Sequence, residues 1–228
     1  MSGARSSAVS GERVRDWLAV VLTVGTGSLN VISFLALGKV FASVITGNLV
    51  LLAIGLGKPD HTMAVHAGVA VAGYAAGVIC GAAVCGRARD RQPPWPRRVS
   101  AALVLELALL CALLGLWQVY GTHPAADAQL VLLGLSTAAM GVQSSAVNRL
   151  AVPGFSSTFL TSTMIKAITE LMTGPREDVT IKVAALLSLV TGALIGTGLL
   201  GAVPRLAPAF PVALVAVVLA VAQLRPVS

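Results

Sequence analysis

The sequence predicts an all-α polytopic membrane protein with about six transmembrane helices and two short polar segments, re-entrant or broken, arranged in two inverted repeats. Three observations predict this fold class. The chain of 228 residues is 56% hydrophobic and 11% charged, and its mean hydropathy of +0.88 is far above that of a soluble domain. Six apolar runs approach the length that a bilayer requires. Lysine and arginine are unevenly divided between the two sides that this arrangement defines.

Each predicted spanning helix is an apolar run close to the length of about 20 residues that a bilayer requires. The six runs are 17–37, 64–85, 99–119, 128–147, 183–203 and 207–224. Residues 1–16 are rich in serine, glycine and arginine, and we expect them to form a cytoplasmic tail. The run after this tail is longer than a signal-peptide core and lacks a clear cleavage site, so we expect an uncleaved first helix.

Two shorter segments, 40–57 and 155–172, combine apolar residues with many polar ones. An unpartnered polar group in hydrocarbon costs several kcal/mol, so these residues must meet a packed interior, a water-filled cavity or a bound solute. In and before the first segment, the polar residues at membrane depth are Thr26, Ser28, Asn30, Ser33, Ser43, Thr46 and Asn48. The second segment includes Thr161, Ser162, Thr163, Lys166, Thr169 and Glu170.

The positions of lysine and arginine favour re-entrant forms of both segments. If both segments cross the membrane, seven basic residues lie on one side and eight on the other, with Lys166 left out. If both are re-entrant, twelve basic residues share one side with the termini and the Arg/Pro loop 86–98, against three on the other. The positive-inside rule then predicts that this loop and both termini are cytoplasmic.

The chain also contains a weak internal repeat, with predicted units 17–120 and 121–228. Thr46-Gly47-Asn48 matches Thr161-Ser162-Thr163 at an offset of 115 residues. The glycines at 73, 77 and 81 match those at 192 and 196 at an offset of 119, and we expect all of them to let helices pack closely. With re-entrant short segments each unit crosses three times, so the second unit is inverted relative to the first, as in many secondary transporters.

The remaining residue inventory argues against an enzyme, a metal site and a nucleic-acid binder. Cys80, Cys85 and Cys111 lie inside apolar runs and are expected to be packing residues. The three histidines lie near predicted helix ends without a close second ligand, so we expect no metal and no other cofactor. The sequence has no Ser, His and Asp set at a consistent depth, no phosphate-binding loop and no paired acidic residues in one segment. The net charge of +7 comes mainly from loops and is explained by membrane topology rather than nucleic acid.

Two motifs, one in each half of the chain, are specific enough to compare with known families. The first is Gly27 to Leu35 (GSLNVISFL), followed by Phe41 and Thr46-Gly47-Asn48. The second is Gly141-Val142-Gln143, Val152-Pro153-Gly154 and the threonine-rich segment 156–163. Together they resemble the YoaK family of bacterial inner-membrane proteins of unknown function. The resemblance covers nearly the whole chain and implies a polytopic bacterial membrane protein.

This chain departs from the family pattern at two positions. The family often has an acidic residue where this chain has Asn30, and Thr-Gly-Thr where this chain has Thr161-Ser162-Thr163. If the acidic residue binds a proton or cation in relatives, this chain has lost that titratable group. The resemblance therefore does not support proton coupling at Asn30.

The two re-entrant segments are the expected contact site for a small solute. A half helix that begins inside the membrane points free N–H groups and the positive end of its dipole at the centre, which favours an anion or a carbonyl-bearing solute. The expected substrate-binding residues are Asn30, Thr46, Gly47, Asn48, Thr161, Ser162 and Thr163. The alternative is that they only tie two helical hairpins to the bundle by hydrogen bonds.

Glu106 is the acidic residue expected well inside a span, about eight residues or roughly 12 Å along a helix from Arg98. An ionisable group at that depth is a candidate proton-linked or ion-linked site. The alternative is a neutral carboxyl group that is hydrogen-bonded to a neighbouring helix. Lys166 and Glu170 are four residues apart, so they are able to pair on one helix face.

We therefore expect a multi-pass protein of the bacterial inner membrane that moves a small solute or ion, as a transporter or a channel, and is not an enzyme. The competing hypothesis is a non-transporting membrane scaffold or regulatory protein, in which the same polar residues only hold helices together. The expected surroundings are the lipid bilayer, and a homo-oligomer is compatible with the sequence.

Overall fold

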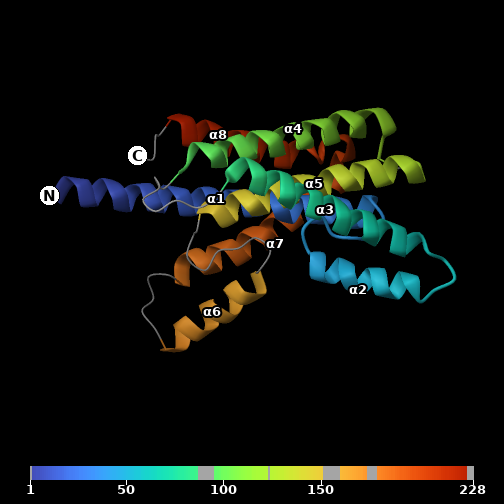
Figure 1. Ribbon diagram of the computed structural model, residues 1–228, viewed down its shortest axis with the longest axis horizontal. Helices are drawn as coiled ribbons and strands as arrows, with labels where there is room; N and C mark the ends of the chain where they lie inside the picture. Colours follow the sequence, from blue (N-terminus) through green and yellow to red (C-terminus); the bar gives the residue numbers. More distant parts are fainter. Residues whose placement is uncertain (1, 87–94, 123, 151–159, 174–178, 225–228) are drawn as a thin grey trace.

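The computed structural model describes residues 2–86, 95–122, 124–150, 160–173 and 179–224, which are almost entirely helical (Figure 1). In chain order the elements are α1 (Ser2–Ala36), α2 (Ile45–Leu56), α3 (Thr62–Cys85), α4 (Arg97–Tyr120), α5 (Ala126–Leu150), α6 (Leu160–Thr173), α7 (Val179–Ala202), η1 (Pro204–Leu206) and α8 (Ala209–Leu224). In these described ranges six helical stretches are long and apolar enough to cross a membrane, and α2 is a shorter apolar helix. The predicted all-α polytopic membrane fold is confirmed.

Helix α1 is longer than the sequence predicted. The expected tail before residue 17 is helical from Ser2 onwards, and the part of α1 that is apolar enough to span begins at Gly11. Helix α1 packs against α7, α8 and α5, so it lies in the interior of the bundle. Its interior position explains why so many of its polar residues avoid lipid.

The polar residues predicted to avoid lipid in the N-terminal half are buried, except Thr46, which is exposed. Those enclosed by protein are Thr26, Ser28, Asn30, Ser33, Ser43 and Asn48. Thr26 donates its hydroxyl hydrogen bond to the carbonyl of Leu22, four residues earlier. Gln143 of α5 donates its side-chain amide to the same Leu22 carbonyl over 3.2 Å. Helices α1 and α5 are therefore joined by polar contacts inside the bundle.

Glycines bring the backbones of α1 and α7 into direct contact. A Cβ added to Gly192 would collide with the carbonyl oxygen of Val24, and one added to Gly196 would lie 2.9 Å from the Cα of Ser28. Because the residue numbers rise together along the two helices, α1 and α7 are parallel. The predicted packing role of these two glycines is confirmed.

The same kind of contact joins α3 to α5. A Cβ added to Gly77 would collide with the carbonyl oxygen of Ala138, and one added to Gly81 would lie 2.8 Å from the Cβ of Ser145. The numbers again rise together, so α3 and α5 are also parallel. This confirms the packing role predicted for the glycines of α3.

The α1–α7 interface and the α3–α5 interface correspond to each other when the two halves of the chain are exchanged. Gly192 and Gly196 stand 115 residues after Gly77 and Gly81, and each glycine approaches the first helix of the other half. The offset of 115 equals that of the Thr46 and Thr161 motifs. It corrects the offset of 119 expected for the glycines, because the counterpart of Gly192 is Gly77 and not Gly73.

Equivalent helices of the two halves run in opposite directions. Gln129, in the first turn of α5, donates its side-chain amide to the carbonyl of Ala36, the last residue of α1. Trp117, near the end of α4, donates its indole N–H to the carbonyl of Pro204, just before α8. These contacts support the inverted repeats that the sequence predicted, while the unit boundaries 17–120 and 121–228 stay a prediction.

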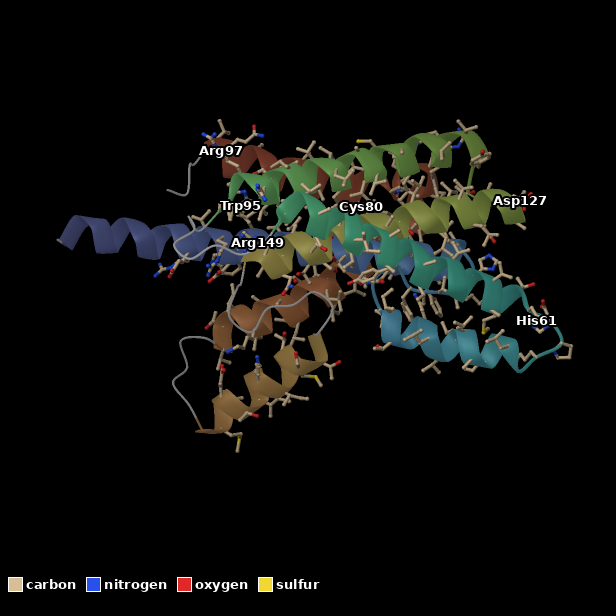
Figure 2. The ribbon with its side chains drawn as sticks, viewed as in Figure 1. His61, Cys80, Trp95, Arg97, Asp127 and Arg149 are labelled. Atoms are coloured by element: carbon tan, nitrogen blue, oxygen red, sulfur yellow. The ribbon has the colours of Figure 1, made fainter. Side chains whose placement is uncertain are left out.

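Charged and polar residues mark the two ends of the bundle. Figure 2 shows His61 and Asp127 at one end, and Trp95, Arg97 and Arg149 at the other. At the first end the hydroxyl and the backbone N–H of Thr62 donate hydrogen bonds to Asp60, and they hold the pKa of Asp60 below its usual value. Both ends therefore carry groups suited to water.

Candidate functional site

The chain folds back into the bundle after α1. Asn30 lies six residues before the end of α1, or roughly 9 Å by helical rise. Its side-chain amide donates to the hydroxyl of Ser43 over 2.8 Å, and its side-chain oxygen accepts from the backbone N–H of Ser43 over 2.9 Å. Helix α2 begins two residues later, at Ile45. The start of α2 therefore lies partway along α1, at the depth of Asn30, rather than at the end of the bundle.

Both ends of the segment 40–57 lie at the same end of the bundle. Gly38, with φ of +101°, lies against the ring of His66 in the first turns of α3, and a Cβ there would collide with that ring. At the other end of the segment, a Cβ on Gly55 would collide with the backbone N of Ala64, also at the start of α3. The segment therefore has the geometry of a re-entrant hairpin, and Figure 1 shows its helix α2 beside α3.

Asn48 holds the loop that precedes α2. Its side-chain oxygen accepts from the backbone N–H of Phe41 over 2.9 Å, and its side-chain amide donates to the Phe41 carbonyl over 2.7 Å. Asn48 itself is fully buried. In this structure the hydrogen bonds of Asn48 go to the loop, as those of Asn30 go to Ser43.

The N-terminus of α2 has no side-chain cap. Its N-cap residue is Val44, which supplies no hydrogen bond from its side chain. Thr46 is exposed and Gly47 is half-buried at the outer edge of the bundle. The predicted binding residues of this segment therefore have two different environments. Asn48 is bonded to the loop, whereas Thr46 and Gly47 lie at the uncapped start of α2.

The second predicted segment lies apart from the first. Helix α6 packs on α7, and Figure 1 shows it beside the opposite end of the bundle from α2. Thr163 is buried, whereas Thr161 and Ser162 are exposed. The structure thus does not bring Thr161, Ser162 and Thr163 together with Asn30, Thr46, Gly47 and Asn48. Residues 155–159 of the predicted segment lie outside the described residues.

An ion pair joins α6 to α7. The carboxylate of Glu170 accepts from the ammonium group of Lys182, whose side chain is 3% exposed. The sequence allowed a pair between Glu170 and Lys166, but Lys166 is exposed and the partner of Glu170 is on the next helix. Glu170 pairs with Lys182 rather than with Lys166 because a nearly buried ammonium group needs a counter-ion more than an exposed one does.

Glu106 lies in the middle of the buried face of α4. It is fully buried, and neither carboxyl oxygen has a hydrogen-bond partner among the described residues. The expected hydrogen bond to a neighbouring helix is therefore not present. A negative charge at this depth would be costly, so the neutral acid is favoured in this state.

A cavity of about 430 Å³ lies between α1, α7 and the loop before α2. Asn30 and Thr197 are the polar side chains of its lining, and the remaining lining residues are glycine or apolar. The rings of Phe34 and Phe41, which both line it, are stacked with their centroids 4.9 Å apart. No sequence pattern indicates this cavity, because its walls come from three separate elements.

The thiol groups have different surroundings. Cys85 is buried, in agreement with the predicted packing role, whereas Cys80 and Cys111 are exposed on the outer faces of α3 and α4. The packing prediction is therefore wrong for Cys80 and Cys111. All three are free thiols, and they need replacement before cysteine labelling.

Comparison with known proteins gives two matches. The model of the DUF1275 family, described as a protein of unknown function, matches residues 18–221. The chain is also similar to the UPF0700 transmembrane protein YoaK of Bacillus subtilis (strain 168), with 32% identity over 157 residues, covering 69% of this chain and 67% of that protein. No solved structure matches the chain.

Proposed function

Because the chain belongs to the YoaK-like DUF1275 family of unknown function, we propose from its geometry that this multi-pass membrane protein transports a small solute and is not an enzyme. The observation that carries the proposal is the inverted packing of the two halves, in which α2 begins partway along α1, at the depth of Asn30. Inverted repeats with broken helices near the midplane recur in secondary transporters.

A difference between the two halves supports a movable element. Gly55 lets α2 approach the backbone of α3 closely, but the residue 115 positions later is Glu170. A carboxylate at that position keeps α6 from packing on α7 as closely, and Lys182 joins the two helices instead. We therefore propose that α6 moves relative to α7 during transport, while the hairpin of α2 stays fixed on α3.

We propose that the protein lies in the bacterial inner membrane with both termini in the cytoplasm. The basis is the uneven division of basic residues, with twelve on the side of the termini and three, Lys39, Lys58 and Arg205, on the other. Arg97 belongs to the basic end, and His61, three residues after Lys58, lies at the opposite end (Figure 2).

Sided thiol labelling checks this orientation. In a chain without its three native cysteines, Lys39→Cys and Lys58→Cys are both expected to react from outside the cell with a membrane-impermeant maleimide. Both side chains are exposed at their positions. Arg97→Cys, exposed at the other end, is the control and is expected to react only after the membrane is permeabilised.

Labelling of Lys39→Cys and Lys58→Cys from opposite sides would contradict the re-entrant hairpin and remove the main support for transport. Labelling of both only after permeabilisation, with Arg97→Cys reacting from outside, would reverse the proposed orientation.

We also propose that Glu106 carries the proton that couples transport. The helices packed on α4 are α3, α5 and α8. Among their described residues the titratable or charged groups are His66, Tyr74, Cys80, Cys85, Asp127 and Arg149. None of these is a second carboxyl group at the depth of Glu106, and Tyr74 donates its hydroxyl to Ser144. Glu106 is thus the candidate for a proton-binding group in this layer.

Uptake into proteoliposomes tests both proposals. We expect saturable uptake of at least one solute from a panel of amino acids, organic acids, alcohols and phenols, with a rate that depends on an imposed pH gradient. Glu106→Gln is expected to keep the fold, because the carboxyl group has no partner to lose, and to lose the dependence on pH. Cys111→Ser, on the exposed face of the same helix, is the matched control.

The two failures are distinct. Absence of saturable uptake for every solute, with a monodisperse and thermally stable protein, would contradict transport. Uptake by Glu106→Gln that still follows the pH gradient would contradict the proton role alone.

One observation favours the second candidate, a membrane scaffold. Asn30 and Asn48 direct their side-chain hydrogen bonds to Ser43 and Phe41 of the loop, as a purely structural role requires. A protein that folds normally, yet moves no solute in the uptake experiment, would support this candidate.

A further inference from the structure

A chain of hydrogen bonds joins three helices at one end of the bundle. The Nδ1 atom of His66, on α3, lies 2.8 Å from the carbonyl oxygen of Thr62, and its Nε2 atom lies 3.3 Å from the side-chain oxygen of Gln129, on α5. The side-chain amide of Gln129 in turn donates to the carbonyl of Ala36, the last residue of α1. One imidazole ring therefore links α3 to α5 and, through Gln129, to the end of α1.

The partners of His66 and Gln129 fix the orientations of both side chains. If the ring of His66 were turned over, a carbon atom would take the place of Nδ1, 2.8 Å from the carbonyl oxygen of Thr62. That distance is much shorter than the roughly 3.3–3.6 Å of a C–H···O contact. If the amide of Gln129 were turned over, its oxygen would face the carbonyl oxygen of Ala36 over 3.2 Å. Both nitrogens of His66 consequently face oxygen atoms.

Both ring nitrogens of His66 therefore require a proton. A neutral imidazole has one N–H group and one nitrogen with a lone pair. Whichever nitrogen carries the hydrogen, the lone pair of the other would face an oxygen atom of Thr62 or of Gln129. An imidazolium ion donates from both nitrogens. Only the protonated ring satisfies the whole chain of hydrogen bonds.

The titratable neighbours of His66 are exposed, whereas His66 itself is only 5% exposed. Helices α2, α4 and α5 pack on α3, and Figure 2 shows His61 and Asp127 at this end of the bundle. Among the described residues, the titratable groups that these helices and the adjoining segments carry at this end are Lys39, Lys58, Asp60, His61, Tyr120 and Asp127, and all six are exposed. Water therefore screens their charges. Within the described ranges no carboxylate lies at ion-pair distance from His66, so its hydrogen bonds to Thr62 and Gln129 hold the proton.

A cavity lies beside the far end of the hydrogen-bond chain. Its volume is about 350 Å³, and Ala36, Gln129 and Thr122 are among its lining residues. Gln129 is the residue that meets Nε2 of His66. The proton on Nε2 is thus one side chain away from a cavity, which gives it a short route to water.

We propose that His66 is a proton-binding site and that its protonation locks the end of α1 to α3 and α5. When Nε2 releases its proton to water, the hydrogen bond to Gln129 is lost and the link to Ala36 weakens. Histidine ordinarily changes its charge between about pH 5 and 8, so the lock forms in acid and is lost as the pH rises. This site is distinct from Glu106, which lies in the middle of α4. The lock does not rest on the proposed function, whereas any control of transport by it does.

Nuclear magnetic resonance of the full chain in detergent micelles tests the protonation directly. The chain contains three histidines, so the carbon-13 ring signal of His66 is identified by its loss in His66→Gln. We expect this signal to change from the imidazolium form at about pH 5 to the neutral form at about pH 8.

Amide hydrogen exchange tests the lock itself. In residues 36–40, after correction for the intrinsic effect of pH, exchange is expected to be roughly fivefold faster or more at about pH 8 than at about pH 5. In His66→Gln the corrected exchange is expected to be the same at both pH values. His61→Gln, exposed at the same end, is the matched control and is expected to keep the pH dependence of the unchanged protein.

A charge variant keeps the test independent of any change at His66. In Gln129→Glu the carboxylate accepts from Nε2–H and adds an opposite charge, so His66 is expected to stay protonated to a pH about 1 unit higher or more. Ala126→Glu adds the same charge at an exposed position in the first turn of α5. Its effect on the His66 signal is expected to be below about 0.5 pH unit, because water screens an exposed charge.

Three results would overturn the inference. They are a neutral His66 at about pH 5, the same pH dependence of exchange in His66→Gln as in the unchanged protein, and an unaltered His66 titration in well-folded Gln129→Glu. Solute uptake by a protein whose residues 36–40 exchange independently of pH would overturn the lock and leave transport intact. A pH-dependent lock in a protein that moves no solute would support the lock and contradict transport.

Discussion

Replacing Gly192 with alanine is expected to lower the free energy of unfolding by roughly 3 kcal/mol, the upper part of the range for overpacking. The added Cβ would meet the backbone carbonyl of Val24, which is unable to rotate away as the end of a side chain does. Helices α1 and α7 would have to separate along their contact. We expect the midpoint of thermal unfolding in detergent to fall by about 6–12 °C for a chain of this length.

Gly198→Ala is the matched control on the same helix. A Cβ at Gly198 meets no atom within 4 Å, and alanine favours a helix over glycine. Its midpoint is therefore expected to stay the same or rise slightly. Equal midpoints for the two variants would contradict the close contact of α1 with α7, on which the exchange relation between the halves depends.

Replacing Asn48 with alanine is expected to detach the loop before α2. The backbone N–H and carbonyl of Phe41 would both lose their partner. Each buried polar group left unpaired costs roughly 1–3 kcal/mol. We expect faster amide hydrogen exchange in residues 37–44, measured by mass spectrometry, and a lower unfolding midpoint.

Leu49→Ala is the control for this variant. Leu49 is the next residue of α2 and is 49% exposed. Its truncation removes the same number of non-hydrogen atoms but leaves no buried polar group unpaired. Its exchange in residues 37–44 is expected to match the unchanged protein. Unaltered exchange in Asn48→Ala would show that the loop is held by other contacts.

Much of the fold was predictable from local sequence. The six spans follow from apolar length, because a bilayer excludes unpaired backbone groups and tolerates long apolar helices. The burial of Asn30 and Asn48 also follows, since lipid offers them no partner. Partners were less predictable, as Ser43 and Phe41 come from a loop without its own periodic pattern.

The candidate site was predicted in part. Its first segment has the expected re-entrant geometry, yet Thr161 and Ser162 lie exposed on α6, away from Asn30. The repeated motif indicated that the two segments occupy equivalent positions in the two halves of the chain. Segments that an inverted repeat relates to each other do not have to be in contact. The predicted offset of 119 residues between the glycines of α3 and α7 was also wrong. Glycines spaced by four residues align equally well when the alignment is shifted by one helical turn.

The sequence by itself determined the membrane environment, the number of spans and the need to bury the polar residues, because these depend on composition and length along one segment. Only the tertiary structure decided which carboxylate meets which ammonium group, with Glu170 pairing across helices to Lys182. It also decided that a cavity remains between α1, α7 and the loop before α2. Such features depend on distances between segments that are far apart in the chain, and packing sets those distances.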